Sequence, residues 1–271
     1  MANQQPIGIF DSGIGGLTVA KAINELLPNE QLIYFGDTAH FPYGDKERKS
    51  IQHYGDKIAE FLLKNNCKSI VIACNTASSA CYNTLRKSLP NNFPIYDVIH
   101  PVADYVAKNH RHSKIGIIAT KGTTNSRAYP KLISEKAPNT QVKSCATPLL
   151  APMIEEGFFN NNISKSIIKS YLTKKHIANI NALILACTHY PIIEKEISNH
   201  YKSIDHDITI INSAKVVAQK VKSDLAKKDL LSSELVKNHE FFVSDYTKSF
   251  EQSSEIFFGK SVKLQKIQLW K

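Results

Sequence analysis

Two cysteines, Cys74 and Cys187, occupy matching positions in the sequence. Each follows an apolar run that ends in alanine, residues 70–73 and 183–186, and each precedes a pair of polar residues. A thiolate is a base and a nucleophile, and a helix N-terminus or a nearby histidine lowers its pKa from the usual value of about 8.5. Cysteine is also an ordinary small buried residue, but two such strand ends in one chain favour a functional pair.

A pair of thiols facing each other across a cleft suits the inversion of a stereocentre by proton transfer. One group removes a proton from one face of the carbon, the other delivers a proton to the opposite face, and the roles exchange in the reverse direction. A disulfide oxidoreductase typically uses a Cys-x-x-Cys motif, which this sequence lacks. We interpret the cysteines at 67, 81 and 145 as packing residues, because none has a comparable setting.

Two further polar residues are expected close to the thiols. His189 lies two residues after Cys187 and should face the same cleft. Asp11 ends the first apolar run and precedes Ser12 and a glycine-rich stretch, so we interpret it as an acid or base of the site, the alternative being a helix cap. That stretch resembles a dinucleotide-binding fingerprint only superficially, since its third glycine position is Thr18, and we expect no nicotinamide cofactor.

Short apolar runs that read as strands alternate with segments of helical spacing, for example 17–27 and 51–63. The runs are residues 7–10, 32–35, 70–73, 95–99, 115–119, 182–186, 208–211 and 241–243. This alternation predicts parallel α/β sheets covered on both faces. Ligands bind beyond the carboxyl ends of such strands, where polar residues gather in this chain, at 11–13, 36–38, 74–76, 119–120 and 187–189.

The length of 271 residues is compatible with about two domains. The two cysteine strand ends are about one domain apart, which suggests two related units, each carrying one thiol. Residues 240–259 again read as a strand followed by a helix, and this segment of the chain could return to the first unit. We therefore predict a discontinuous first domain, residues 1–97 plus 207–271, and a second domain, residues 98–206.

Composition excludes several classes of protein. With 42% hydrophobic and 21% charged residues, the chain is neither disordered nor of low complexity. The net charge of +10 is spread along the chain, so we expect no specific nucleic-acid binding. There is no apolar run long enough to cross a membrane and no signal-peptide pattern, and we expect a cytoplasmic protein. No cysteine or histidine spacing indicates a metal site.

Four segments, residues 7–19, 34–44, 73–78 and 186–191, resemble glutamate racemases, the cofactor-independent amino-acid racemases of bacterial cell-wall synthesis. Weaker similarity continues through 115–129, 148–157 and 241–259, so the resemblance spans nearly the whole chain. The family often has Arg where this chain has His40, Glu where it has His100, and Asp where it has Asn212. None of these departures falls on a residue that we assign to the chemistry.

The resemblance implies two flavodoxin-like domains with the active site in the cleft between them. It implies that Cys74 acts on D-glutamate and Cys187 on L-glutamate, with Asp11 and His189 assisting the two thiols. Glu155 resembles an accessory acid near the second thiol, with Glu156 as the alternative. The positions that match substrate-binding residues of the family are Asp11, Ser12, Tyr43, Gly44, Asn75, Thr76, Thr188 and His189.

The expected substrate is free glutamate, with no cofactor and no metal, and a homodimer is compatible with the sequence. The nearest alternative is an aspartate or other amino-acid racemase of the same superfamily. A non-catalytic α/β ligand-binding protein and a nucleotide-dependent oxidoreductase are also open, although neither explains the paired cysteines.

Overall fold

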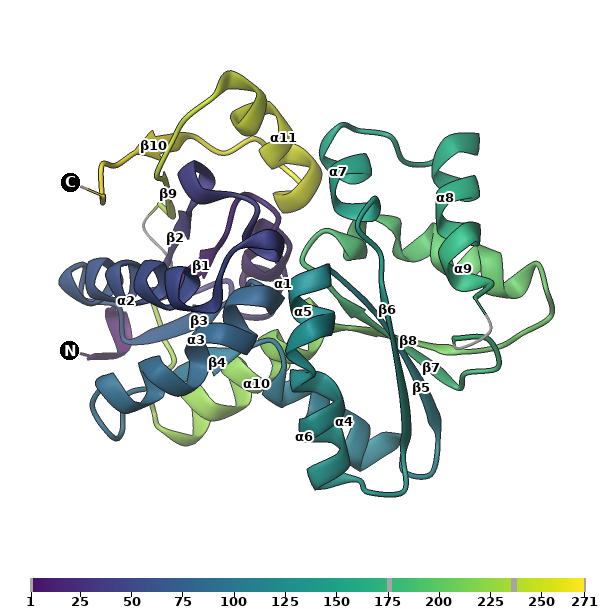
Figure 1. The fold of residues 1–271 in the computed structure, drawn as a ribbon. Helices are drawn as coiled ribbons and strands as arrows, with labels where there is room; N and C mark the ends of the chain where they lie inside the picture. Colours follow the sequence, from purple (N-terminus) through teal and green to yellow (C-terminus); the bar gives the residue numbers. More distant parts are fainter. Residues whose placement is uncertain (1, 175–176, 235–237, 271) are drawn as a thin grey trace.

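The computed structural model describes residues 2–174, 177–234 and 238–270 and contains two parallel β-sheets. The six-stranded sheet has the order β10-β9-β2-β1-β3-β4. Its strands are β1 (Ile7–Asp11), β2 (Leu32–Gly36), β3 (Ser69–Ile72), β4 (Ile95–Asp97), β9 (Glu240–Val243) and β10 (Leu264–Lys266). We call this sheet and the helices packed on it the first lobe, which lies on the left in Figure 1.

The four-stranded sheet has the order β6-β5-β7-β8 and forms the second lobe, on the right in Figure 1. Its strands are β5 (Lys114–Ala119), β6 (Gln141–Ala146), β7 (Ala182–Ala186) and β8 (Thr209–Asn212). Every strand pair recorded among the described residues is parallel. The prediction of two parallel α/β sheets is therefore confirmed.

The strands missed by the sequence reading are both edge strands. β6 borders the four-stranded sheet, and the first four of its residues are alternately exposed and half-buried, so it lacks the continuous apolar run of β1 or β7. β10 is three residues long and borders the other sheet. Apolar runs reveal central strands because both faces of those strands are buried.

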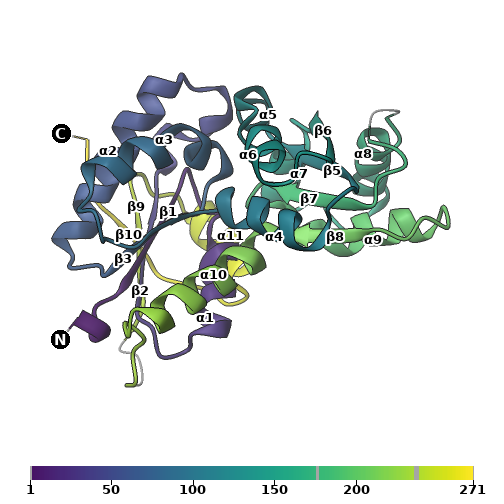
Figure 2. The same ribbon diagram turned by 90° about the horizontal axis from the view of Figure 1, so that it is seen from below.

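Helices cover both sheets, as Figures 1 and 2 show. The first lobe carries α1 (Leu17–Leu26), α2 (Arg48–Lys64), α3 (Asn75–Ser88), α10 (Ser213–Lys227) and α11 (Lys248–Phe258). The second lobe carries α4 (His100–Asn109), α5 (Lys121–Ser126), α6 (Ala128–Lys136), α7 (Leu150–Glu155), α8 (Asn162–Leu172) and α9 (Glu194–Lys202). Four short 3₁₀ turns complete the described elements: η1 (Ala2–Gln4), η2 (Thr38–His40), η3 (Tyr43–Asp45) and η4 (Tyr190–Ile193).

The chain crosses between the lobes after β4 and again after β8. We expected residues 207–271 to belong to the first domain, but β8 pairs with β7 in the four-stranded sheet, so residues 209–212 belong to the second lobe. The chain returns only at α10, which packs on α1. β9 then pairs with β2, which places the C-terminal segment on the first sheet.

A buried ion pair ties together the amino end of the first sheet. Lys68 Nζ lies 2.6 Å from Glu30 Oε2, and each side chain is 2% exposed. Lys68 also donates to the carbonyls of Asn3 and Leu230, and Glu30 accepts from the backbone N–H of Ser232. These contacts join four chain segments at the end of the lobe remote from Cys74.

Replacing Lys68 with Met should lower the free energy of unfolding by about 3–5 kcal/mol, because it leaves the Glu30 carboxylate buried without its cation. Lys64→Met is the matched control: Lys64 pairs with Glu60 at 2.9 Å, but both side chains are largely exposed. Its cost should stay below about 1 kcal/mol. Urea denaturation of the two variants measures the difference, and equal losses would contradict this account.

Within the described ranges, no helix combines the length and the apolar character that a membrane span requires.

Candidate active site

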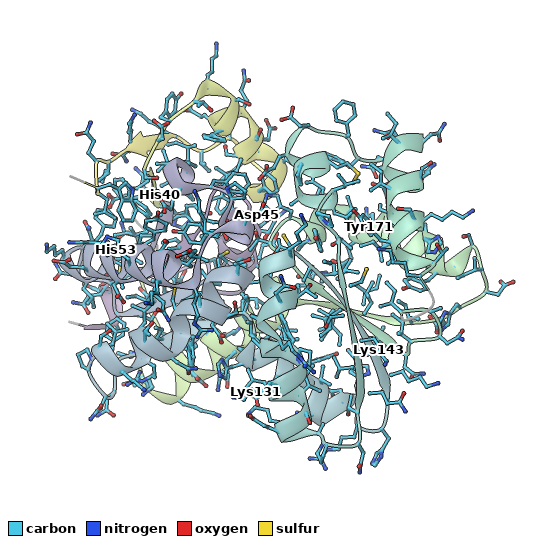
Figure 3. All side chains as sticks on the ribbon, in the orientation of Figure 1. His40, Asp45, His53, Lys131, Lys143 and Tyr171 are labelled. Atoms are coloured by element: carbon cyan, nitrogen blue, oxygen red, sulfur yellow. The ribbon has the colours of Figure 1, made fainter. Side chains whose placement is uncertain are left out.

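A cavity of about 140 Å³ lies between the lobes, where the carboxyl ends of strands from both sheets meet. Nearly all of the site residues expected from the sequence border it: Ser12, Tyr43, Gly44, Cys74, Asn75, Thr76, Cys187, Thr188 and His189. Asp45, which also borders the cavity, is labelled at the junction of the lobes in Figure 3. The structure therefore brings the two cysteines, one from each lobe, to a single small cavity.

Cys74 follows β3 and is the N-cap residue of α3. Its Sγ accepts from the backbone N–H of Ala77 at 3.4 Å and lies 3.6 Å from Ser12 Oγ. Burial raises the pKa of the Cys74 thiol to about 12, and the nearby Asp11 charge adds to the effect, against the lowering by the Ala77 N–H and the Ser12 hydroxyl. Cys74 is therefore a protonated thiol in the free protein at neutral pH, with the N–H of Ala77 in place to stabilise a negative charge on the sulfur.

Asp11 does not border the cavity but lies directly behind its wall. Its Oδ2 accepts from the backbone N–H groups of Gly13 at 3.2 Å and Gly16 at 3.0 Å. Burial raises the pKa of Asp11, while the charge of His189 and the glycine N–H groups oppose that rise. Its Oδ1 is buried without a partner among the described residues. The bonds to Oδ2 are those of a helix cap, and the unpartnered Oδ1 leaves the role of an acid or base of the site open as well.

The second thiol belongs to a chain of three side chains. Cys187 Sγ lies 3.5 Å from His189 Nδ1, and His189 Nε2 donates to Glu155 Oε1 at 2.6 Å. Burial lowers the pKa of His189, but the charges of Cys187 and Glu155 and their hydrogen bonds outweigh burial and raise it to about 10. His189 is thus an imidazolium at neutral pH. Glu156 is exposed, which favours Glu155 as the accessory acid.

The two strand ends differ more than their sequences indicate. Cys74 caps a 14-residue α-helix, whereas Cys187 precedes the 3₁₀ turn η4 and has the His189 cation as its neighbour. The Cys74 sulfur therefore has one N–H of a helix N-terminus beside it, and the Cys187 sulfur has a positive side chain.

Residues of the first lobe hold His189 in place across the interface. A Cβ on Gly15 would lie only 2.4 Å from His189 Cε1, so the absence of a side chain there makes room for the imidazole. Phe257 of α11 packs its ring edge-on against His189, with centroids 5.2 Å apart. Thr18 Oγ1 donates to the carbonyl of Thr188 at 2.8 Å.

Tyr43 borders the cavity, and its hydroxyl is bonded to Asp37. The hydroxyl donates to Asp37 Oδ2 at 2.6 Å, and Ser244 donates to Oδ1 at 2.7 Å. His40 Nδ1 completes the set, 2.9 Å from Asp37 Oδ2. The carboxylate of Asp37, fully buried, thereby fixes the loop that carries Tyr43 and Gly44. Sequence reasoning placed Asp37 at a strand end but gave it no role.

Sequence reasoning also missed a cluster of hydroxyls that spans the lobes. Thr76 Oγ1 lies 3.0 Å from Thr120 Oγ1 and 3.1 Å from Thr123 Oγ1, and both Thr76 and Thr120 border the cavity. Thr147, at the end of β6, borders it too. The position of Thr120 directly after an apolar run was the available signal.

Among the described residues there is no group of three or more His, Cys, Asp and Glu side chains suited to hold a metal ion. The residues around the cavity instead supply hydroxyls, the Asn75 amide, the Lys121 ammonium and the His189 imidazolium as donors. Such donors bind carboxylates.

Comparisons with known proteins agree with the geometry. Residues 7–221 match the model of the Asp/Glu/hydantoin racemase family. A glutamate racemase of Neisseria meningitidis serogroup C is 38% identical over 97% of this chain and 96% of its own. One from Geobacter metallireducens is 39% identical over 93% and 92% of the two chains.

Solved structures give the same result. The glutamate racemase of Francisella tularensis, in complex with D-glutamate, superposes with a TM-score of 0.90 at 37% identity over 99% of both chains. A glutamate racemase isoform of Bacillus anthracis gives 0.91 at 35% identity over 98% of both. The chain therefore belongs to the Asp/Glu/hydantoin racemase family, among its glutamate racemases.

Proposed function

We propose that this chain interconverts L-glutamate and D-glutamate without a cofactor, using Cys74 and Cys187 as the two proton-transferring groups. The observation that carries the proposal is the presence of both sulfurs at one cavity, each contributed by a different lobe. A small amino acid held between them would have one thiol near each face of Cα. This is the arrangement that inversion by proton transfer requires.

In the direction from L-glutamate, the Cys187 thiolate removes the Cα proton. The electron pair left on Cα is delocalised into the α-carboxylate, and the Cys74 thiol then protonates the opposite face to give D-glutamate. Cys187 ends as a thiol and Cys74 as a thiolate, and the reverse reaction exchanges these states. The imidazolium of His189, 3.5 Å from Cys187 Sγ, attracts the negative charge that this sulfur carries as a base.

Burial and hydrogen bonds set the protonation state of Cys74. With its pKa raised by burial to about 12, Cys74 rests as the acid, ready to protonate Cα. When Cys74 acts as the base, the charge that forms on its sulfur is received by the Ala77 N–H and the Ser12 hydroxyl. We assign Asp11 to this half of the reaction and the pair of His189 and Glu155 to the other.

The remaining site residues are proposed to hold the substrate. Hydroxyls, the Asn75 amide and backbone N–H groups around the cavity would bind the two carboxylates of glutamate. We assign this role to Ser12, Asn75, Thr76 and Thr188, with Tyr43 and Gly44 shaping the wall. The hydroxyl cluster adds Thr120 to the set.

Circular dichroism of L-glutamate and of D-glutamate, each incubated with the purified protein and no added cofactor, tests the proposal. Both signals should decay to zero, because the two enantiomers have equal free energy. Signals that persist would contradict racemisation and favour a ligand-binding protein. Decay with aspartate but not with glutamate would favour the alternative substrate.

We further propose that the D-glutamate serves peptidoglycan synthesis in the cytoplasm. Expression of the chain in a bacterium that requires D-glutamate should then permit growth without it, whereas a Cys74→Ala chain should not. A homodimer stays a prediction, which light scattering coupled to size-exclusion chromatography tests.

Replacing Glu155 with Gln should move the alkaline limit of activity to lower pH. His189 is charged below its pKa of about 10 and loses its proton as the pH rises through that value. Gln keeps an acceptor for Nε2–H but removes the negative charge that helps to hold this pKa above the ordinary 6.5. At a pH of about 8, kcat/KM should fall roughly tenfold.

The matched control is Glu156→Gln, because Glu156 is the adjacent acid and is exposed. Its pH profile should match that of the unaltered chain. A shift with Glu156→Gln and none with Glu155→Gln would reverse the assignment of the accessory acid.

A further inference from the structure

Within the described residues, only one of the two polar atoms of the Asn75 side-chain amide has a hydrogen-bond partner. The residue is 3% exposed and borders the cavity as the first residue of α3. Its Oδ1 accepts from the hydroxyl of Tyr129 at 2.7 Å. Its Nδ2 is buried and has no hydrogen-bond partner within the described part of the chain. A buried amide nitrogen without a partner costs free energy unless a bound molecule supplies an acceptor.

Tyr129 lies in α6 of the second lobe, whereas Asn75 belongs to the first. The tyrosine is 1% exposed and packs within the apolar core that runs through both lobes. Burial raises the pKa of Tyr129 well above 10, so the hydroxyl keeps its proton and donates. A second acceptor, the carbonyl of Val98, lies 3.2 Å away on the segment that crosses between the lobes.

The distances indicate which way the amide faces. Bonds of the O–H···O type cluster near 2.7–2.8 Å and those of the N–H···O type near 2.9–3.0 Å. The 2.7 Å separation thus fits a tyrosine O–H that donates to Oδ1, with the carbonyl of Val98 as a weaker second acceptor. With Oδ1 held on the Tyr129 side, the two Nδ2 hydrogens are left for the cavity. Only an acceptor, such as a carboxylate oxygen, can satisfy them.

We propose that Tyr129 is a positioning residue, which orients the Asn75 amide so that its N–H groups bind a carboxylate of the substrate. The inference rests on the proposed racemisation of glutamate. Because the donor comes from the second lobe and the amide from the first, Asn75 is correctly oriented only when the lobes have the relative placement seen in this structure. Carboxylate binding and lobe placement are thereby coupled through one hydrogen bond.

Replacing Tyr129 with Phe keeps the buried ring and removes only the hydroxyl. KM for glutamate should rise about tenfold while kcat changes less than about twofold, because the carboxylate contact is made in both the ground state and the transition state. Tyr96→Phe is the matched control. Tyr96 is also buried, but within the described residues its hydroxyl has no hydrogen-bond partner, so its KM should not change.

A double variant separates positioning from a general structural effect. In an Asn75→Ala background, Tyr129→Phe should change KM by less than about twofold, because the group that Tyr129 orients is gone. An unchanged KM in the single Tyr129→Phe variant, or an equal tenfold rise in the Asn75→Ala background, would overturn the inference. Failure of the unaltered chain to racemise glutamate would instead overturn the proposed function, and this inference with it.

A second measurement needs no Tyr129 variant. In the ¹⁵N–¹H NMR spectrum of the unaltered chain, the side-chain NH₂ signals of Asn75, identified by their absence in Asn75→Ala, should shift when D-glutamate is added. Signals that stay in place under saturating glutamate would contradict the assignment.

Discussion

Replacing either Cys74 or Cys187 with Ala should abolish the interconversion of glutamate enantiomers, with a loss of about 10⁴-fold or more in kcat. Each variant lacks the proton donor and acceptor for one face of Cα, and general acid–base groups typically contribute 10²–10⁴-fold. Because racemisation uses both thiols in each direction, the two variants should fail equally whichever enantiomer is supplied. Polarimetry or circular dichroism from both enantiomers measures the loss.

Cys145→Ala is the control for these substitutions. Cys145 is buried in β6 and does not border the cavity. It should retain the turnover of the unaltered chain, with its thermal midpoint as the check on folding. Normal turnover by Cys74→Ala or by Cys187→Ala would overturn the assignment of the pair.

The second large effect is expected at His189. His189→Asn leaves a polar group beside Cys187 but removes the positive charge that lies 3.5 Å from its sulfur. Without this cation, the negative charge that forms on Cys187 in a buried site has lost its main stabilising partner, and kcat should fall about 10³-fold.

In the His189→Asn variant, the primary isotope effect should change for one enantiomer of the substrate and not for the other. With Cα-deuterated L-glutamate, which Cys187 deprotonates, the primary isotope effect on kcat should increase. With Cα-deuterated D-glutamate it should not. His110→Asn serves as the control, since His110 is the C-cap residue that follows α4 and does not border the cavity. Equal isotope effects from both enantiomers would contradict the pairing of His189 with Cys187.

The central part of the fold follows from the sequence because the central strands are buried on both faces. The apolar runs before Asp11, Cys74 and Cys187 correspond to β1, β3 and β7. The polar residues that directly follow these runs are then expected at the carboxyl edge of the sheets. Most of them line the cavity in the structure. The edge strands β6 and β10 give no such signal, since most of their residues are exposed or half-buried.

The contacts between the lobes could not be predicted from local patterns. The contact of Tyr129 with Asn75, the fit of His189 against Gly15, and the hydroxyl cluster all join residues that are distant in the chain. The end of a strand places a residue at the carboxyl edge of its sheet. Which residue of the other lobe it contacts depends on how the two sheets are placed relative to each other. The same reason explains β8, whose short apolar run could have joined either sheet and pairs with β7.

The most direct test of the two-thiol account is racemisation in deuterated water. Each thiol exchanges its proton with solvent, so the product enantiomer formed from L-glutamate, and that formed from D-glutamate, should carry deuterium at Cα. Proton NMR and mass spectrometry of the separated enantiomers measure the incorporation. Product that retains its original Cα hydrogen in both directions would contradict proton transfer by Cys74 and Cys187.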